Sequence, residues 1–405
     1  MSRPPRRAAV AVGACLLALG CARVDPRWTA GTARPRSAAV SPSSLDGAQA
    51  RVALGARHLA ADRLAEAAEA FRSALHADAA CADALLGLAV VASRAGEDEA
   101  ALVLATAAWR SAPGNPRVAI VAARLLLQGG LPVDAALLLE HAIERAPSDL
   151  ALRLHAAMAR TRAGDVMAAE EHLARATAIS PGASAPRILG IDLWLLTGRT
   201  AKAISAAESL ARDRPEDARA REALGRALRA GGRPREALDA FAEAERLAPA
   251  WAPAPIGAGW AAIEAGDAVT ARERFRRALE LSPASCAASL GLAEALIALG
   301  DRPSALQIYE GLLLGPLPPA TALNNVAWSH IGSGDVSEEA LELARGAVDL
   351  DPGHPSYLDT LGWGLYRAGR TREALWYLEE AARRAPANRT IAGHLEEAVR
   401  SPSGR

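Results

Sequence analysis

The sequence predicts an all-α protein, a solenoid of about ten helical hairpins followed by one capping helix. Three interlocked series of residues that repeat every 34 positions carry this prediction. The prolines are Pro113, Pro147, Pro181, Pro215, Pro249 and Pro283. The glycines are Gly96, Gly130, Gly164, Gly198, Gly232, Gly266, Gly300 and Gly334, then Gly369 after one inserted residue. The alanines are Ala67, Ala101, Ala135, Ala169, Ala203, Ala237, Ala271 and Ala305, then Ala340 and Ala374. A content of 51% hydrophobic but only 4% aromatic residues also favours close-packed helices over sheets.

Each series has a structural meaning within a hairpin. Glycine near position 15 of the repeat is expected to end the first helix, because glycine accepts a left-handed backbone. Alanine at position 20 and a small residue at position 8 let the two helices approach closely, and a bulky residue at position 24 fills the remaining space. Proline at position 32 stops the second helix and sets the turn into the next hairpin.

A period of 34 with small residues at 8 and 20, a large one at 24 and proline at 32 resembles the tetratricopeptide repeat over residues 48–388. Ten units start near Ala48, Ala82, Pro116, Leu150, Ser184, Ala218, Ala252, Cys286, Ala320 and Pro355. The resemblance implies a right-handed superhelix whose concave groove, lined by the first helices, binds protein or peptide partners. We expect one continuous array and not two globular domains, with a capping helix over 389–400 and a frayed tail over 401–405.

The first 20 residues have the three-part pattern of a secretory signal. Arg3, Arg6 and Arg7 precede an apolar run from Ala8 to Leu19. This run is shorter than the ~20 apolar residues that a membrane-spanning helix needs. Residues 21–47 are rich in Ser, Pro, Ala, Gly and Arg, without apolar periodicity, and predict a flexible tether.

The segment Leu17–Cys21 resembles the lipobox of bacterial lipoproteins, in which the signal is cut before a cysteine that then carries lipid. The resemblance implies lipidation at Cys21 after secretion across the inner membrane. Ala22, in place of an aspartate that retains lipoproteins in the inner membrane, implies an outer-membrane anchor facing the periplasm. The alternative is an ordinary cleaved signal with an incidental cysteine, since Ala18 stands where lipoboxes more often carry leucine.

The sequence shows no pattern for catalysis, a cofactor or a metal. Formal net charge is zero and Lys202 is the only lysine, so no nucleic-acid partner is expected. Cys81 and Cys286 lie six repeats apart, and the eight histidines have no metal-ligand spacing. Gly257–Ala262 superficially matches a dinucleotide fingerprint but falls inside a predicted first helix without a preceding strand. We therefore expect a binding protein and not an enzyme.

Position 9 of each first helix is expected to line the groove. It reads Ala56, Val90, Arg124, Met158, Asp192, Arg226, Trp260, Glu294, Trp328 and Trp363. Positions 5 and 12 around the tryptophans add Ile256, Ile263, Asn324, Ile331, Asp359 and Tyr366. We hypothesise that this C-terminal stretch binds the partner, with aromatic anchors burying area and Asn324 and Asp359 forming hydrogen bonds. The alternative is that the tryptophans only pack between neighbouring first helices.

The sixth repeat presents Arg219, Arg226 and Arg229 with Glu222 on one helix face. Two interpretations are an anion-binding patch and a solvated face of mixed charge, and the second is favoured.

The segments Leu323–Trp328 and Leu358–Trp363 resemble the terminal repeats of bacterial envelope tetratricopeptide proteins. Several of these accompany exopolysaccharide export or surface-protein sorting, including lipoproteins of PEP-CTERM systems. The resemblance implies a membrane-tethered scaffold that recruits protein partners to envelope assembly, export or secretion. The alternative function is a carbohydrate-binding module for exported polysaccharide, with Trp260, Trp328 and Trp363 as stacking platforms.

Overall fold

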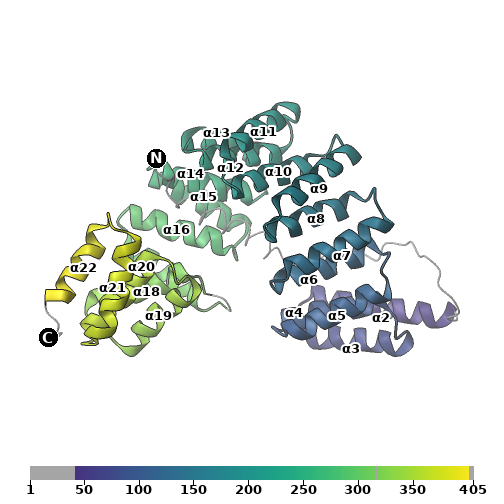
Figure 1. The fold of residues 1–405 in the computed structure, drawn as a ribbon, viewed down its shortest axis with the longest axis horizontal. Coiled ribbons are helices and arrows are strands. Elements are labelled where there is room, and N and C mark those ends of the chain that lie inside the picture. The colour runs from purple at the N-terminus through teal and green to yellow at the C-terminus, as the bar shows by residue number, and fades with distance from the viewer. Residues whose placement is uncertain (1–41, 316–317, 401–405) are drawn as a thin grey trace. The chain divides into compact units, whose positions relative to one another are not determined.

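The computed structural model describes residues 42–315 and 318–400, and each regular element in these ranges is an α-helix (Figure 1). The first helices of the hairpins are α2 (Pro42–Ala60), α4 (Ala82–Arg94), α6 (Pro116–Gln128), α8 (Leu150–Arg162), α10 (Ser184–Leu196), α12 (Ala218–Ala230), α14 (Pro253–Glu264), α16 (Cys286–Ala298), α18 (Ala320–Ser333) and α20 (Pro355–Arg367). The second helices are α3 (Leu64–Ala77), α5 (Asp98–Ser111), α7 (Pro132–Arg145), α9 (Val166–Ile179), α11 (Thr200–Asp213), α13 (Pro234–Leu247), α15 (Ala268–Leu281), α17 (Arg302–Leu313), α19 (Glu338–Leu350) and α21 (Thr371–Arg384). A last helix, α22 (Arg389–Arg400), follows them. The predicted all-α solenoid of helical hairpins is confirmed.

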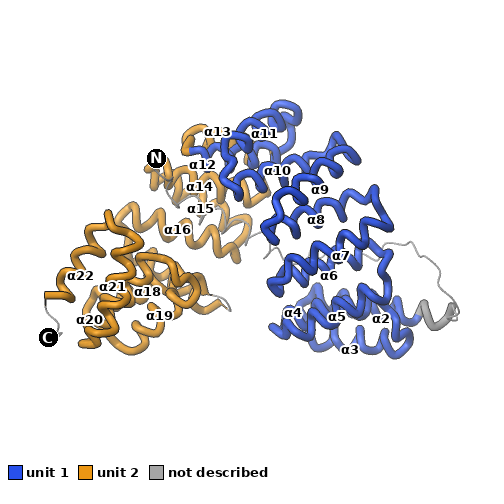
Figure 2. The backbone as a smooth tube through the Cα atoms, in the orientation of Figure 1, with its two compact units in different colours: residues 1–231 blue, residues 232–405 orange. Residues whose placement is uncertain are grey.

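The chain forms two compact units, Met1–Gly231 and Gly232–Arg405 (Figure 2). The first unit holds α2 to α12 and the second holds α13 to α22. Within each unit a second helix packs on its own first helix and on the first helix that follows, so contacts are local, as in other repeat proteins. The sequence predicted one array, and the 34-residue register does run on through the turn where the units divide.

The turn inside each hairpin needs a left-handed backbone. Every glycine of the 34-residue series has a positive φ, from 71° at Gly232 to 96° at Gly334. The first hairpin has Asp62 at the equivalent place, with a φ of 58°. Aspartate is one of the few residues that adopt this conformation at modest cost. The prediction that glycine ends the first helix is therefore confirmed, and the N-terminal hairpin ends its first helix with aspartate.

In the repeats of Phe71 and Phe275, the large residue at position 24 packs between two glycines of successive first helices. A Cβ at Gly55 would lie 2.7 Å from Phe71, and one at Gly87 would lie 2.5 Å from it. Phe275 has the same relationship to Gly259 and Gly291, at 2.7 and 2.2 Å. Each aromatic ring thus joins position 8 of its own repeat to position 6 of the next. The ring fixes how closely consecutive first helices approach.

The ends of the array differ in how well their boundaries were predicted. Helix α2 begins at Pro42, six residues inside the segment 21–47 predicted as a tether. Proline suits the first turn of a helix, since its missing N–H has no partner there. Helix α22 covers the predicted capping segment and buries Ile391 and Ala398. The predicted signal peptide, the lipidation residue Cys21, residues 22–41 of the tether and the tail 401–405 lie outside the described residues.

None of the helices that the structure describes is both long and apolar enough to cross a membrane.

Candidate functional site

Three first helices of the second unit carry the predicted aromatic binding residues. Trp260 lies on α14, Trp328 on α18 and Trp363 on α20. Their exposure differs: Trp328 is 38% exposed, Trp260 is half-buried and Trp363 is only 9% exposed. The three indoles therefore do not form one uniform wall, and Trp328 is the tryptophan of this set most open to a ligand.

Trp260 has a packing role on α14. Its indole meets the ring of Phe275 edge-on, with ring centroids 5.3 Å apart and an interplanar angle of 76°. Ile256 and Ile263 lie half-buried beside it and pack against the same hydrophobic cluster. Part of the indole is still accessible, so Trp260 both supports the core and borders the surface.

The final repeat is closed by the last helix. His394 of α22 stacks on Trp363, with ring centroids 4.3 Å apart and an angle of 18° between the planes. Its Nδ1 atom lies 2.9 Å from Oδ1 of Asp359. Asp359 and Tyr366 are each 6% exposed. Asp359 was expected to hydrogen-bond a ligand and Trp363 to stack on one, but α22 already occupies both side chains.

Trp328 also borders this cluster from α18. Its indole lies 5.7 Å from the His394 ring, in a tilted arrangement that leaves much of the indole exposed. Asn324 lies one turn earlier on the same face of α18 and is 7% exposed. The Asn324 amide nitrogen approaches the Asn325 side-chain oxygen at 3.5 Å, while its own oxygen, Oδ1, is buried without a hydrogen-bond partner. The exposed part of this end of α18 is therefore the Trp328 ring, whereas the Asn324 oxygen is closed off from the surface.

Glu294 occupies position 9 of α16, between the tryptophans of α14 and α18 in the repeat register. It is half-buried, and burial raises the pKa of its carboxyl. The Tyr309 hydroxyl lies close by, and burial followed by the charge of Glu294 raises the pKa of Tyr309 to about 12. The Tyr309 side chain hydrogen-bonds Asn325 of α18, which links α17 to the helix that carries Trp328.

The arginines of the sixth repeat are part of a buried charge network. Arg226 forms ion pairs with Asp192 of α10 and, at 2.8 Å, with Glu222 of its own helix. Asp192 and Glu222 are 8% and 9% exposed, and burial raises the pKa of both carboxyls. The positive charge of Arg229 acts on Glu222 in the opposite direction.

The expectation of a solvated face was wrong for two of its residues: Arg226 is engaged by carboxylates and Glu222 is buried, whereas Arg219 is exposed and Arg229 is half-buried. The physical reason is the repeat register, which stacks position 9 of α10 against position 9 of α12.

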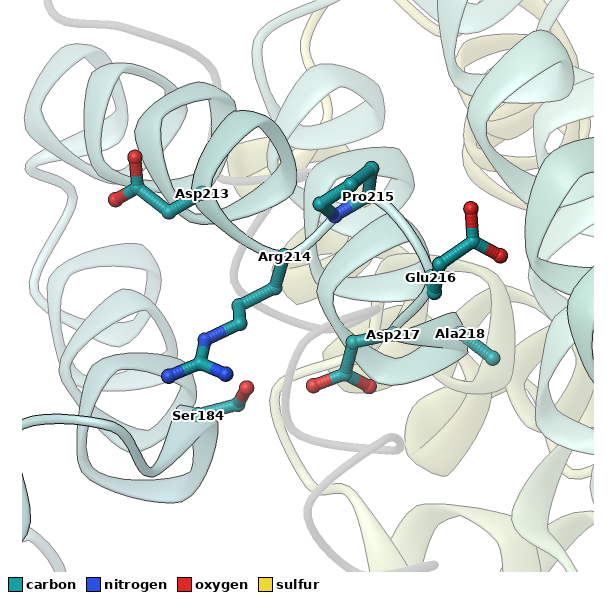
Figure 3. A pocket seen from close by; sticks show the side chains of 7 residues that line it. All are labelled: Ser184, Asp213, Arg214, Pro215, Glu216, Asp217 and Ala218. Atoms are coloured by element: carbon teal, nitrogen blue, oxygen red, sulfur yellow. The ribbon is translucent and has the colours of Figure 1, made fainter.

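A shallow depression in the first unit lies at the turn between α11 and α12 (Figure 3). It is lined by Ser184, Asp213, Arg214, Pro215, Glu216, Asp217 and Ala218. Asp213 accepts a hydrogen bond from Arg187 at 2.8 Å, and this bond lowers the pKa of the Asp213 carboxyl. Asp217 caps α12 by accepting from the Arg219 backbone N–H. These acids are occupied in holding the turn.

Across residues 42–315 and 318–400, no three His, Cys, Asp or Glu side chains gather in a way that could hold a metal ion.

Family models establish what this array of hairpins is. Two models, each described as tetratricopeptide repeat, match residues 58–125 and 262–315, and residues 120–184 and 197–250. Together they cover more than half of the 405 residues. The chain belongs to the tetratricopeptide repeat family. The repeat found in the sequence and the helical hairpin found in the structure are the same tetratricopeptide unit.

Individual tetratricopeptide proteins are similar over different extents. The TPR repeat-containing protein PA4667 of Pseudomonas aeruginosa is 37% identical over 78 residues, which span 19% of this chain and 13% of that protein. A tetratricopeptide repeat protein from Parabacteroides merdae aligns with a TM-score of 0.50 at 14% identity, over 62% of this chain and 99% of its own. A chain of the Cut9–Hcn1 complex of the APC/C aligns with a TM-score of 0.55 at 13% identity, over 87% of this chain and 76% of its own. At these identities the two structures show a shared fold.

Two residues with notable surroundings in the structure, Glu294 and His394, were not selected from the sequence. Glu294 stood in the position-9 series, but a lone acid among tryptophans gave no motif to select it. His394 lies in the capping helix, 35 residues after Asp359, close to the repeat period. Treating the capping segment as an eleventh first helix, and aligning it with the others, would have placed His394 against the tenth repeat.

Proposed function

We propose that this protein is a non-catalytic scaffold that binds protein partners through the first helices of its second unit. Tetratricopeptide proteins commonly mediate protein–protein interactions. Because this chain belongs to that family, a role in binding other proteins is supported. The binding surface we propose, called the partner face below, consists of Ile256, Trp260, Glu294, Asn324 and Trp328.

One observation carries the choice of this surface: Trp328 is 38% exposed on a first helix. A large exposed aromatic ring leaves apolar area in water that a partner can cover. Tryptophans in such positions are frequent energetic centres of protein interfaces.

A matched pair of variants tests the partner face. Trp376 lies on α21, a second helix, and is 61% exposed. Affinity capture from envelope extracts with the full chain carrying Cys21→Ser is compared with the same chain also carrying Trp328→Ala or Trp376→Ala. We expect defined proteins to be retained by the parent and by Trp376→Ala, and lost from Trp328→Ala while the chain stays folded.

Two results would overturn this proposal. If Trp328→Ala retains the same proteins as the parent, the partner face is wrong. If no protein is enriched but an exported polysaccharide binds and quenches tryptophan fluorescence, the protein is a carbohydrate-binding module.

We further propose that the array is secreted and lipid-anchored through Cys21 in the cell envelope, at the outer membrane facing the periplasm. The support is the signal-like pattern of residues 1–20 and the lipobox-like segment Leu17–Cys21. The anchor would hold the scaffold at an assembly or export machine. Membrane fractionation tests it: the parent chain should enter the detergent phase and Cys21→Ser should not. An unchanged partition of Cys21→Ser would exclude lipidation at this residue.

A further inference from the structure

Three consecutive second helices of the first unit, α5, α7 and α9, carry large apolar side chains that face the solvent. These side chains, called the apolar patch below, are Val103, Val133, Leu137 and Met167, which are 65%, 52%, 54% and 75% exposed. Val133 and Leu137 lie one turn apart on the same face of α7. A group of exposed apolar side chains of this kind marks a surface that contacts another molecule.

The three helices that carry the apolar patch are neighbours, and they follow one another along the first unit (Figure 1). Trp109 of α5 meets His141 of α7 edge-on, with ring centroids 5.9 Å apart. Glu140 of α7 lies 3.6 Å from the Nε2 atom of His172 on α9. Leu137 precedes Glu140 and His141 by about one turn on α7. The apolar patch therefore extends over three adjoining helices, with Leu137 on the middle one.

The repeat register shows that apolar residues are unusual at this place. The position two residues after the repeated alanine is exposed in each of the ten hairpins that the structure describes. Seven of the ten residues at this position are polar, namely Glu69, Glu171, Ser205, Asp239, Glu273, Gln307 and Glu342. Val103 and Leu137 occupy it in the consecutive helices α5 and α7, and Trp376 occupies it in α21. The hairpin fold does not require an apolar residue here, so the apolar patch needs another explanation.

Exposed charges stand at both ends of α5 and α7. The acids in the first turns are Glu99 of α5 and Asp134 of α7, and the arginines in the last turns are Arg110 and Arg145. None of these four side chains forms a hydrogen bond or an ion pair with the residues that the structure describes. By contrast, α13, α15 and α21 each pair an exposed arginine with a glutamate of the same helix. On α5 and α7, apolar side chains thus lie between unpaired acids at one end and unpaired arginines at the other.

We propose that the apolar patch is the contact surface between two copies of this chain, which pair through α5 and α7. A two-fold axis perpendicular to α7 packs this helix against itself in antiparallel orientation. Asp134 then faces Arg145 of the partner subunit, and opposite charges attract. Glu99 likewise faces Arg110 of the partner subunit. A parallel arrangement would instead place like charges together, which disfavours it.

A second copy fits this surface better than a membrane does. Contact about a two-fold axis requires a self-complementary surface, and an apolar centre between opposite charges meets that requirement. A lipid surface attracts an excess of basic side chains, whereas both signs of charge border the apolar patch. Four partly exposed side chains are a small contact, since a stable interface buries about 800 Å² on each partner. The pairing is therefore weak, and we expect it at micromolar concentrations.

This inference concerns the first unit and is independent of the partner face, which lies on the second unit. Two paired chains would carry two partner faces. A ligand with two binding motifs would then bind more tightly than a ligand with one, because its second contact forms within the same complex.

Sedimentation equilibrium of the full chain carrying Cys21→Ser, from about 1 to 100 μM, tests the pairing. The average mass should rise with concentration from one chain towards two. Leu137→Glu places a charge in the apolar patch and should weaken the association about tenfold or more. Ser205→Glu introduces the same residue at the equivalent exposed position of α11 and should associate as the parent does.

A charge exchange tests the antiparallel orientation. Arg145→Glu should weaken the association, because an acid then faces Asp134 of the partner subunit. Adding Asp134→Arg to the same chain exchanges the two charges and restores opposite charges across the axis, so the association should recover. Melting curves verify that each variant is folded.

Three results would overturn this inference. They are a mass that stays at one chain over the whole range, equal association of Leu137→Glu and the parent, and no recovery in the double variant. None of these results bears on the partner face, because the test of that surface follows the proteins captured by the Trp328→Ala variant.

Discussion

The imidazole of His394 lies flat on the indole of Trp363, with ring centroids 4.3 Å apart, while its Nδ1 atom contacts the Asp359 carboxylate at 2.9 Å. A single residue of α22 thus covers two side chains of the tenth repeat, at positions 5 and 9. Through this contact α22 covers the tenth hairpin, burying its own Ile391 and Ala398. It also confines the proposed partner face to α14, α16 and α18.

Replacing His394 is expected to open this end. In His394→Ala the buried Asp359 carboxylate loses its partner, so the free energy of unfolding should fall by about 1–3 kcal/mol. Acrylamide should quench Trp363 more strongly, because the stacked ring is gone. His76→Ala, an exposed change on α3, is the control. Unchanged stability together with unchanged quenching would contradict the closing role of His394.

The contact between Phe71 and Gly87 is expected to tolerate no side chain. A Cβ at Gly87 would lie 2.5 Å from the ring, so Gly87→Ala should lower the free energy of unfolding by about 1–3 kcal/mol. Gly393 on α22 has no neighbour within 4 Å of such a Cβ. Gly393→Ala should therefore be neutral or stabilise by up to about 1 kcal/mol. Urea denaturation compares the two, and equal stability would show that position 6 does not set the helix spacing.

Removing Arg226 is expected to destabilise the first unit in a pH-dependent way. Arg226→Met leaves Asp192 and Glu222 buried without their counter-charge, at a cost of about 3–5 kcal/mol near neutral pH. Burial raises the pKa of both carboxyls, so each takes up a proton at a higher pH in the folded than in the unfolded chain. The cost should therefore shrink as the pH falls through these raised values and vanish below the ordinary range near ~4.

Stability curves for Arg226→Met and the parent at several pH values measure this effect. Arg212→Met, an exposed change on α11, serves as the control and should show no such trend. A deficit of Arg226→Met that stays constant with pH would mean that the two acids are not the source of the cost.

Glu294 should lower the stability of the free protein. Since burial raises the pKa of its carboxyl, the charged form is disfavoured in the folded state at neutral pH. Glu294→Gln should therefore melt at a higher temperature than the parent at pH 7. The advantage should decline as the pH falls through the raised pKa and be lost below the ordinary glutamate range. A lower Tm for Glu294→Gln at pH 7 would show that the carboxylate stabilises the fold.

The repeat pattern was sufficient to predict most of the fold. The start of α4, α6, α8, α10, α12, α16, α18 and α20 follows from the 34-residue register, because local turn chemistry and small residues act within each hairpin. The start of α2 was placed too late, since Pro42 lies in a segment whose composition resembles a linker.

Side-chain partners were harder to predict than helices. Asp359 and Arg226 were assigned to an open groove from their register positions, but His394 and Asp192 occupy them in the structure. Such pairs form between repeats, so a position within one repeat does not reveal them. The hydrogen bond between Tyr309 and Asn325 shows the same limit, because it also joins two repeats. Phe275 and Gly291 pack together at the same two positions one repeat earlier.

Hydroxyl-radical footprinting of the array with a captured partner tests the proposed partner face most directly. Trp328 on α18 and Trp376 on α21 are both exposed and so both are oxidised in the free protein. Binding should protect Trp328 and leave the oxidation of Trp376 unchanged. Protection of Trp376 with full oxidation of Trp328 would mean that partners bind the second helices, and the partner face proposed for this protein would be wrong.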